Sequence, residues 1–368
     1  MEKPTENAPK VVESLIISSI KKSIKNSKKT TVSIALSSGI DSTLMLALLK
    51  KTCPDVKINA ISIKFANSVD ESKDAAKIAS KFDVDHHIVF VENYLEELPT
   101  AISVIKKPFW DLHWYHVVKK AKTLGKTLVS GDGGDELFGG YTFRYEKFLS
   151  LITKNSTPLE KTKAYLECHE RDWVPDQDKL FGKQLRFSWH EVYRRILPFF
   201  DNHLSSLLQV FLADFNGKLL YNWIPLNSSI HKHFGVKSVA PLLSKETIQY
   251  ATHIPINLKY DLRAGVGKLV LRQILKKHSL EQLLIKKKQG FSVDTISLWN
   301  SYGYDLCDYY LSDSRIVQQK WIDKLWIDKH FRRDLNVRYI NKFLGLLAFE
   351  AWYRIFITKE MKATTTLS

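Results

Sequence analysis

The first 135 residues alternate short β-branched runs with longer apolar helical patterns, and this alternation restricts the fold more than any other feature. Strands that alternate with helices usually pair in parallel, because each helix carries the chain back to the start of the next strand. We expect strands at 31–36, 58–65, 87–91 and 127–129, and helices at 11–24, 41–50, 73–82 and 113–124. The sequence therefore predicts an α/β fold whose parallel sheet is wound with helices.

The second half of the chain has a different character. Beyond about residue 150 the strand patterns fade and helical patterns dominate. The strongest lies at 342–357, where Leu344, Leu347, Ala351 and Ile355 keep the spacing of a buried helix. We expect an N-terminal helical segment at 1–30, an α/β core at 31–150, and a mainly helical portion at 151–368 that completes the domain and its substrate pocket.

Composition excludes several classes of protein. No apolar run reaches the roughly 18 to 20 residues that span a bilayer, and the polar N-terminus is not a signal peptide. We therefore expect a cytoplasmic protein. Cys53, Cys168 and Cys307 lie far apart without a Cys-x-x-Cys spacing, so neither a disulfide framework nor a zinc site is predicted.

The net charge of +16 has two interpretations. A strongly basic chain is typical of proteins that bind nucleic acid or acidic membranes. Here, however, the lysines are spread in short groups, as at 21–22, 119–120 and 286–288, which is also typical of a solvated lysine-rich surface. A phosphate-handling site accounts for only a few of these charges.

The loop from Ser37 to Ser42 joins the first predicted strand to its helix. Small residues let the backbone approach a polyanion, and the following helix offers free N–H groups and the positive end of its dipole. Asp41 would repel a bare phosphate, so its place in this loop indicates a bridging cation. A simple helix N-cap is the alternative interpretation of these residues.

The segment from Ser130 to Tyr141 follows the fourth predicted strand and holds five glycines and three acidic residues within twelve positions. A plain turn needs one or two glycines and no acidic cluster. Three adjacent carboxylates are costly unless they meet cations or hold a proton. Ligands of wound parallel sheets bind beyond the carboxyl ends of the strands, where both segments lie.

Together these two segments resemble the asparagine synthetase family. The loop at Ser37 resembles the family's pyrophosphate-binding loop, and the segment at Ser130 resembles its second signature. Further similarity lies at 286–291, at Gly267-Lys268 with Leu271-Arg272, and at 235–243, so the resemblance runs from about Val11 to Phe356. It implies an adenine nucleotide α-hydrolase-like (PP-loop ATPase) core that uses ATP and Mg²⁺ to activate a carboxylate as an acyl-adenylate, which ammonia or an amine then converts to an amide.

The resemblance also implies roles for particular residues. It places the pyrophosphate and the rest of the nucleotide against Leu36, Ser37, Ser38, Gly39, Asp41, Ser42, Ile63, Ser130 and Gly131, with Leu36, Ile63 and Gly131 beside the adenosine.

Asp41 and Asp135 are implied to bind magnesium. Lys288 is implied to stabilise negative charge on the phosphoryl oxygens, a role suited to a fixed ammonium group. Asp132 lies where the family has an acidic residue near the attacking amine, so a general-base role is expected. Glu136 is implied to help fix the substrate.

Two departures from the family affect the substrates. Position 2 is Glu, and the predicted pyrophosphate loop begins at residue 37, so we expect no glutaminase domain on this chain and ammonia from another source, such as a separate glutaminase subunit. Ser228-Ser229 and Lys237-Ser238-Val239 stand where relatives that make asparagine carry an Asp-Arg pair and Glu-Ala-Arg. Serine cannot replace the bidentate contacts of an arginine.

The substrates and the function class therefore stay open at this stage. Aspartate is one acid, and related enzymes act on sugar acids, on β-amino acids that close to β-lactams, or on peptides that become macrocycles. A tRNA-modifying PP-loop ATPase and a non-catalytic scaffold are the alternatives from other classes, although the acidic segment argues against both. Gly265-Val266-Gly267-Lys268 lacks the spacing of a Walker loop, and we reject it as a nucleotide site.

Overall fold

The computed structural model describes residues 7–65, 72–283 and 294–368. Its main sheet within these ranges has the strand order β3-β2-β1-β4-β5, and every neighbouring pair is parallel. The strands are β1 (Thr31–Ala35), β2 (Lys57–Phe65), β3 (Asp85–Val91), β4 (Thr127–Val129) and β5 (Lys237–Val239). The prediction of an α/β fold with a wound parallel sheet is confirmed.

Strand β5 was not predicted, because a run of three residues that includes Lys237 and Ser238 carries no β pattern. It pairs with β4 from Thr127 to Val129 and makes the edge of the sheet. A second short pairing, between β6 (Tyr260–Asp261) and β7 (Val266–Gly267), is antiparallel and forms a hairpin. Both elements come from the second half of the chain, which therefore contributes β5 to the main sheet and a separate two-stranded sheet.

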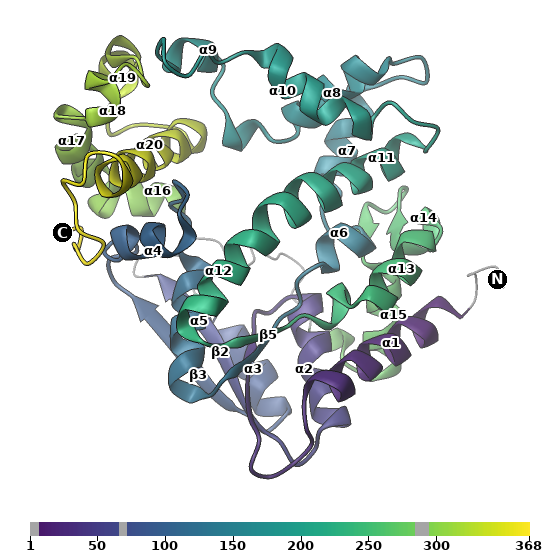
Figure 1. Ribbon diagram of the computed structural model, residues 1–368. Helices are drawn as coiled ribbons and strands as arrows, with labels where there is room; N and C mark the ends of the chain where they lie inside the picture. Colours follow the sequence, from purple (N-terminus) through teal and green to yellow (C-terminus); the bar gives the residue numbers. More distant parts are fainter. Residues whose placement is uncertain (1–6, 66–71, 284–293) are drawn as a thin grey trace.

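Helices make up the rest of the fold (Figure 1). Those of the first half are α1 (Ala8–Ser23), α2 (Ile40–Thr52), α3 (Ser72–Lys81), α4 (Leu98–Ile105), α5 (His113–Leu124) and α6 (Gly134–Phe138). Among those that follow are α7 (Thr142–Leu151), α8 (Pro158–Glu167), α10 (Trp189–Ile196), α11 (Ser206–Ala213), the π-helix η3 (Asp214–Trp223), α12 (Ile224–Phe234), α13 (Lys245–His253), α15 (Leu269–Lys277), α17 (Tyr304–Ser312) and α20 (Val337–Phe356). None of the helices in the described ranges is long and apolar enough to cross a membrane.

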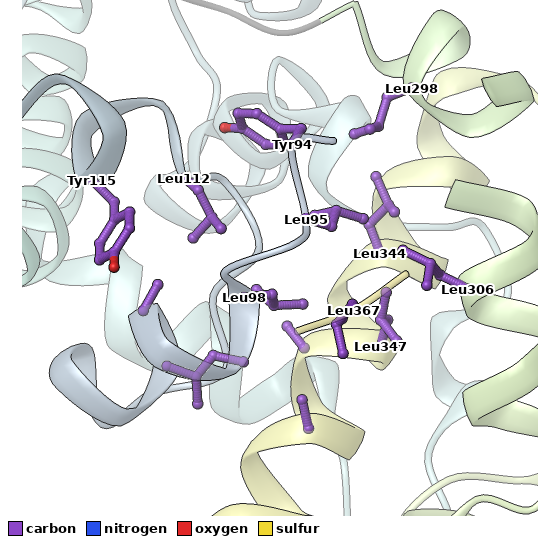
Figure 2. Packing of buried hydrophobic residues seen from close by; sticks show 14 of the residues in the cluster. Tyr94, Leu95, Leu98, Leu112, Tyr115, Leu298, Leu306, Leu344, Leu347 and Leu367 are labelled. Atoms are coloured by element: carbon purple, nitrogen blue, oxygen red, sulfur yellow. The ribbon is translucent and has the colours of Figure 1, made fainter. Parts of the chain in front are cut away.

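Helix α20 lies at the centre of the largest core cluster, as the buried pattern at 342–357 predicts, although the helix begins earlier, at Val337. Figure 2 shows Leu344 and Leu347 of this helix beside Leu95 and Leu98 and beside Leu367 near the C-terminus. A second cluster joins α1, α2 and α15 on another part of the sheet. The two clusters hold the strand ends of β1 and β4 in place between them.

Glu13 anchors α1 to its neighbours through a cluster of ion pairs. Its carboxylate accepts hydrogen bonds from Lys277 Nζ at 2.8 Å, His278 Nε2 at 2.8 Å and Lys51 Nζ at 3.1 Å. Burial opposes the charged form, but these three bonds prevail and lower the pKa of Glu13 to about 2. A carboxyl group whose pKa falls on folding stabilises the fold above its unfolded pKa and loses that effect as the pH falls towards the folded value.

We therefore expect Glu13→Gln to lower the free energy of unfolding by about 2 kcal/mol at pH 7, after allowance for the exposed lysine partners. The deficit should shrink as the pH falls below 4.5 towards 2. Glu246→Gln is the matched control, because its pair with Lys22 lies in solvent on both sides and should contribute nothing measurable. Urea unfolding at several pH values tests this, and an equal deficit at pH 7 and pH 3 would contradict it.

Candidate active site

Two loops meet at the carboxyl ends of β1 and β4, which are neighbours in the sheet. The first is the segment that follows β1, from Ser37 to Ser42, and the second is the acidic segment that follows β4. Both line one cavity of about 870 Å³. The fold thus brings together two segments that lie almost 100 positions apart in the sequence, at the edge where wound parallel sheets bind ligands.

The first loop is held in shape by its own hydroxyl groups. Ser42 Oγ donates to the Ser37 carbonyl at 2.9 Å and accepts from the Ser37 backbone N–H at 3.1 Å. Gly39 is the N-cap of α2, so the first N–H groups of that helix face the loop. Ser38 Oγ is buried and makes no hydrogen bond with the described residues. This arrangement can bind an anion at the N-terminus of α2.

The glycines of the second segment allow the two loops to touch. A Cβ atom on Gly131 would lie 2.7 Å from the Cβ of Asp41, and one on Gly134 would lie 2.3 Å from Asp41 Oδ1. Real Cβ contacts are not so short, so a larger residue at either position would push the loops apart. Close packing against Asp41 thus explains the glycines at 131 and 134, whereas Gly133 and Gly139 have the positive φ that favours glycine.

Lys268 joins the two loops from a third part of the chain. Its Nζ lies 2.6 Å from Asp135 Oδ1 and also contacts Asp41 Oδ2. Burial disfavours the charge, but the carboxylates of Asp135 and Asp41 outweigh it and raise the pKa of Lys268. A permanently charged ammonium group therefore sits between the two residues that the sequence predicts as magnesium ligands.

Glu136 belongs to a hydrogen-bonded series of polar side chains that line the cavity. Tyr141 donates its phenol proton to Glu136 Oε1 at 2.7 Å, and Lys218 Nζ donates to the same phenol oxygen at 2.9 Å. Burial, together with the charge of Asp135, raises the pKa of Glu136 to about 7. This carboxyl group can therefore exist with or without its proton near neutral pH, as a group that handles protons must.

Asp132 lies between the second segment and the π-helix η3. Its two oxygens accept from Ser130 Oγ at 2.8 Å and from Trp223 Nε1 at 3.3 Å. Burial raises its pKa in spite of these two bonds. The two bonds therefore fix the direction of the carboxyl group, and its pKa is higher than that of an exposed aspartate. Both properties suit an acid–base group.

Most of the residues that the sequence predicts for the site line this cavity. They are Ser37, Ser38, Gly39, Asp41, Ser42, Ser130, Gly131, Asp132, Asp135 and Glu136. Leu36 and Ile63, expected beside the adenosine, do not line it: the side chain of Leu36 is fully buried in one core cluster, and Ile63 packs against the other. Lys288 lies outside the described residues.

The altered acceptor positions also lie elsewhere. Ser228 and Ser229 are on α12, where Ser229 Oγ bonds to the Pro225 carbonyl, and residues 237–239 form β5. None of them lines the cavity. The π-helix η3 just before α12 supplies Lys218, Asn222 and Trp223 to the wall instead.

Sequence reasoning missed several lining residues. Lys268 belongs to the segment Gly265-Val266-Gly267-Lys268, which the sequence excludes as a Walker loop because its spacing is wrong for that motif. Lys268 nevertheless lines the cavity, which it reaches directly after the hairpin β6–β7. The resemblance of Gly267-Lys268 and the nearby Leu271-Arg272 to the family was the signal that could have identified Lys268 as a site residue. Asp111, His113, Arg144, Lys218 and Trp223 also line the cavity, and they stand in no recognisable motif.

Comparison with known proteins gives one consistent family. A family model described as "Asparagine synthase" matches residues 12–354. The glutamine-hydrolysing asparagine synthetase 1 of Bacillus subtilis (strain 168) is 25% identical over 292 residues, which cover 70% of this chain and 45% of that protein. The chain thus spans about half the length of the curated relative that it matches.

Two solved structures align with parts of this chain at low similarity. The NMN synthetase of Francisella tularensis aligns with 57% of this chain and 95% of its own, at 17% identity and a TM-score of 0.29. The U34-tRNA thiolase NcsA of Methanococcus maripaludis aligns with 61% of this chain and 78% of its own, at 15% identity and a TM-score of 0.27.

Proposed function

Because the chain belongs to the asparagine synthase family, we propose that it is an ATP-dependent ligase that activates a carboxylate as its adenylate and converts it to an amide. The observation that carries this proposal is the meeting of the two strand-end loops, with Asp41 and Asp135 on either side of Lys268, at one cavity. The family favours amide formation over the tRNA-modifying alternative. Aspartate with ammonia is the first pair of substrates to test.

The reaction has two steps at this site. A carboxylate oxygen of the acid attacks the α-phosphorus of ATP, the bond to the β-phosphate breaks, and pyrophosphate leaves from the loop at Ser37 and the N-terminus of α2. The nitrogen lone pair then attacks the acyl carbon, and AMP leaves with the bonding electrons. Lys268 offsets the negative charge of Asp41 and Asp135, so that two phosphates can approach two carboxylates.

Magnesium fits the residues present at this site. Mg²⁺ prefers one or two carboxylates, with phosphates and water completing its octahedron. Asp41 and Asp135 converge on one ammonium group, and Asp41 Oδ1 is buried without a hydrogen-bond partner in the described part of the chain. These two residues would hold the ion, which would neutralise charge on the phosphates when bound.

We expect magnesium-dependent release of AMP and pyrophosphate when a suitable acid is present, and exchange of labelled pyrophosphate into ATP. Asp41→Asn and Asp135→Asn should each lower the exchange rate by about two orders of magnitude, the usual effect of removing one preorganised electrostatic group. Asp85→Asn is the control, because Asp85 pairs with Lys57 at the surface.

A panel of carboxylic acids that includes L-aspartate, assayed with ATP, MgCl₂ and labelled pyrophosphate, tests the proposal. ADP as the sole nucleotide product would exclude adenylation. If Asp41→Asn or Asp135→Asn exchanges pyrophosphate as fast as the unchanged chain, the replaced aspartate has only a structural role, as a helix cap or a packing residue.

A further inference from the structure

A histidine paired with an aspartate lines the cavity and has no part in the function proposed so far. His113 is the first residue of α5, and its side chain is about 10% exposed. Its Nδ1 lies 2.8 Å from Asp111 Oδ1. The same oxygen accepts the phenol proton of Tyr94, which lies at the edge of the core cluster in Figure 2. Both Asp111 and His113 line the cavity.

These contacts determine which nitrogen of the imidazole carries the proton. An ionised carboxylate can only accept hydrogen bonds, and the partners of Asp111 keep it ionised: although burial opposes its charge, His113 and Tyr94 lower its pKa. Nδ1 of His113 must therefore be the donor. In the neutral ring Nε2 then carries the lone pair, and it makes no hydrogen bond with the described residues.

Trp223 connects this pair to Asp132. Its ring stacks on His113 with centroids 5.3 Å apart and an interplanar angle of 14°, and its Nε1 donates to Asp132 Oδ1. His113 and Asp132 therefore approach the same part of the cavity along the face and the edge of one indole. Both oxygens of Asp132 already accept hydrogen bonds, whereas Nε2 of His113 has no such bond with any residue that the structure describes.

We propose that His113, oriented by Asp111, is the proton acceptor of the amide-forming step, and that Asp132 positions the attacking nitrogen. As the nitrogen bonds to the acyl carbon of the adenylate, the acyl–oxygen bond to AMP breaks and AMP takes the electron pair. The nitrogen's excess proton goes to Nε2 of His113, which later releases it to water. This inference rests on the proposed function and concerns its second step alone.

The charged surroundings of His113 determine how this step depends on pH. Asp111 faces its Nδ1, Asp132 lies across Trp223, and His116 follows one turn later on α5. Burial lowers the pKa of His113, but the charges of Asp111 and Asp132 outweigh it and raise that pKa above its usual value. His116 stays neutral near pH 7, because burial lowers its pKa to about 4. The rate should thus rise with pH as His113 loses its proton.

The test separates the two steps on the whole chain. The unchanged protein is assayed for pyrophosphate exchange with a panel of acids that includes L-aspartate, and for amide formation with ammonium chloride and simple primary amines. His113→Gln keeps a side-chain amide that can bond to Asp111 but cannot accept a proton at neutral pH. We expect amide formation to fall by about 100-fold while exchange stays within about threefold of the unchanged chain.

The pH profile distinguishes proton transfer from mere support of the loop. At a fixed concentration of the free ammonia or amine, His113→Gln should abolish the rising limb of amide formation. Asp111→Asn should move that limb to lower pH, because the imidazole loses the anion that raises its pKa. His116→Gln is the matched control: His116 is a buried histidine of the same helix that does not line the cavity, and both steps should be unchanged.

Three results would overturn the proposal: equal loss of exchange and amide formation in His113→Gln, amide formation within threefold of the unchanged chain, or a rising limb that His113→Gln leaves in place. If the unchanged chain gives no exchange with any acid, or no amide with any nitrogen source, the proposed function fails and this inference falls with it.

Discussion

Lys268→Met should lower the free energy of unfolding by about 3 to 5 kcal/mol and abolish measurable pyrophosphate exchange. Methionine keeps most of the side chain's length but removes the ammonium group that contacts both Asp41 and Asp135. Breaking a buried ion pair by deleting one partner is costly, because the remaining charge stays buried. Here that charge is the carboxylate of Asp41, whose side chain is 10% exposed. Chemical unfolding at neutral pH, without magnesium, measures this effect.

Lys259→Met is the matched control for that measurement. Lys259 is as deeply buried as Lys268, but it forms no ion pair with the described residues, and burial alone lowers its pKa to about 8. Its ammonium group lies 5.6 Å from the ring centre of Phe211. A buried charge without a counter-ion contributes little to the stability of the fold. Lys259→Met should therefore leave the free energy of unfolding unchanged or raise it. Equal destabilisation by both variants would show that side-chain packing, and not charge, accounts for the effect at Lys268.

Lys288→Met should slow the adenylation step by about two to three orders of magnitude, or roughly 3 to 4 kcal/mol, with a much smaller change in ATP affinity. This prediction comes from the sequence resemblance, because Lys288 lies outside the described residues. The transition state carries extra negative charge between the α-phosphate and the departing pyrophosphate, and a positioned ammonium group acts most strongly at that moment. Single-turnover kinetics separates the rate from the affinity.

Lys286→Met and Lys287→Met serve as controls for Lys288, since all three residues belong to one run. Each control variant should stay within a few-fold of the unchanged chain. Similar losses at all three positions would mean that the run acts as a diffuse basic patch, and Lys288 would have no particular role in adenylation.

Strands β1 to β4 and the two loops that follow β1 and β4 could be predicted because their signals are local. β1 is a short β-branched and apolar run that ends at Ala35, two positions before Ser37, and β4 ends directly before the glycine-rich acidic segment. Each loop is therefore identified by its own neighbours in the sequence. The parallel arrangement then requires both loops to meet at one edge. For the same reason the predicted residues of these loops line one cavity.

The remaining wall of the cavity could not be predicted, because it depends on contacts between distant parts of the chain. Lys268 meets Asp41 across 227 positions. Trp223 meets Asp132 across 91, and a π-helix, which has no reliable sequence pattern, sets its direction. His113 and Asp111 resemble any polar pair before a helix until Tyr94 and Trp223 are seen around them. Such side chains acquire a role only from the tertiary fold.

The pairing of β4 with β5 has a consequence for synthesis of the chain. On the order of 100 residues separate Val129 from Lys237, so β4 leaves the ribosome long before its partner is made. At about 5 to 20 residues per second, that edge waits for roughly 5 to 20 s with its backbone groups unpaired. An open apolar strand edge is a template for pairing with other chains. Nascent chains should thus be most prone to aggregate during this interval, and a chaperone supplied during translation should raise the soluble yield more than one added afterwards.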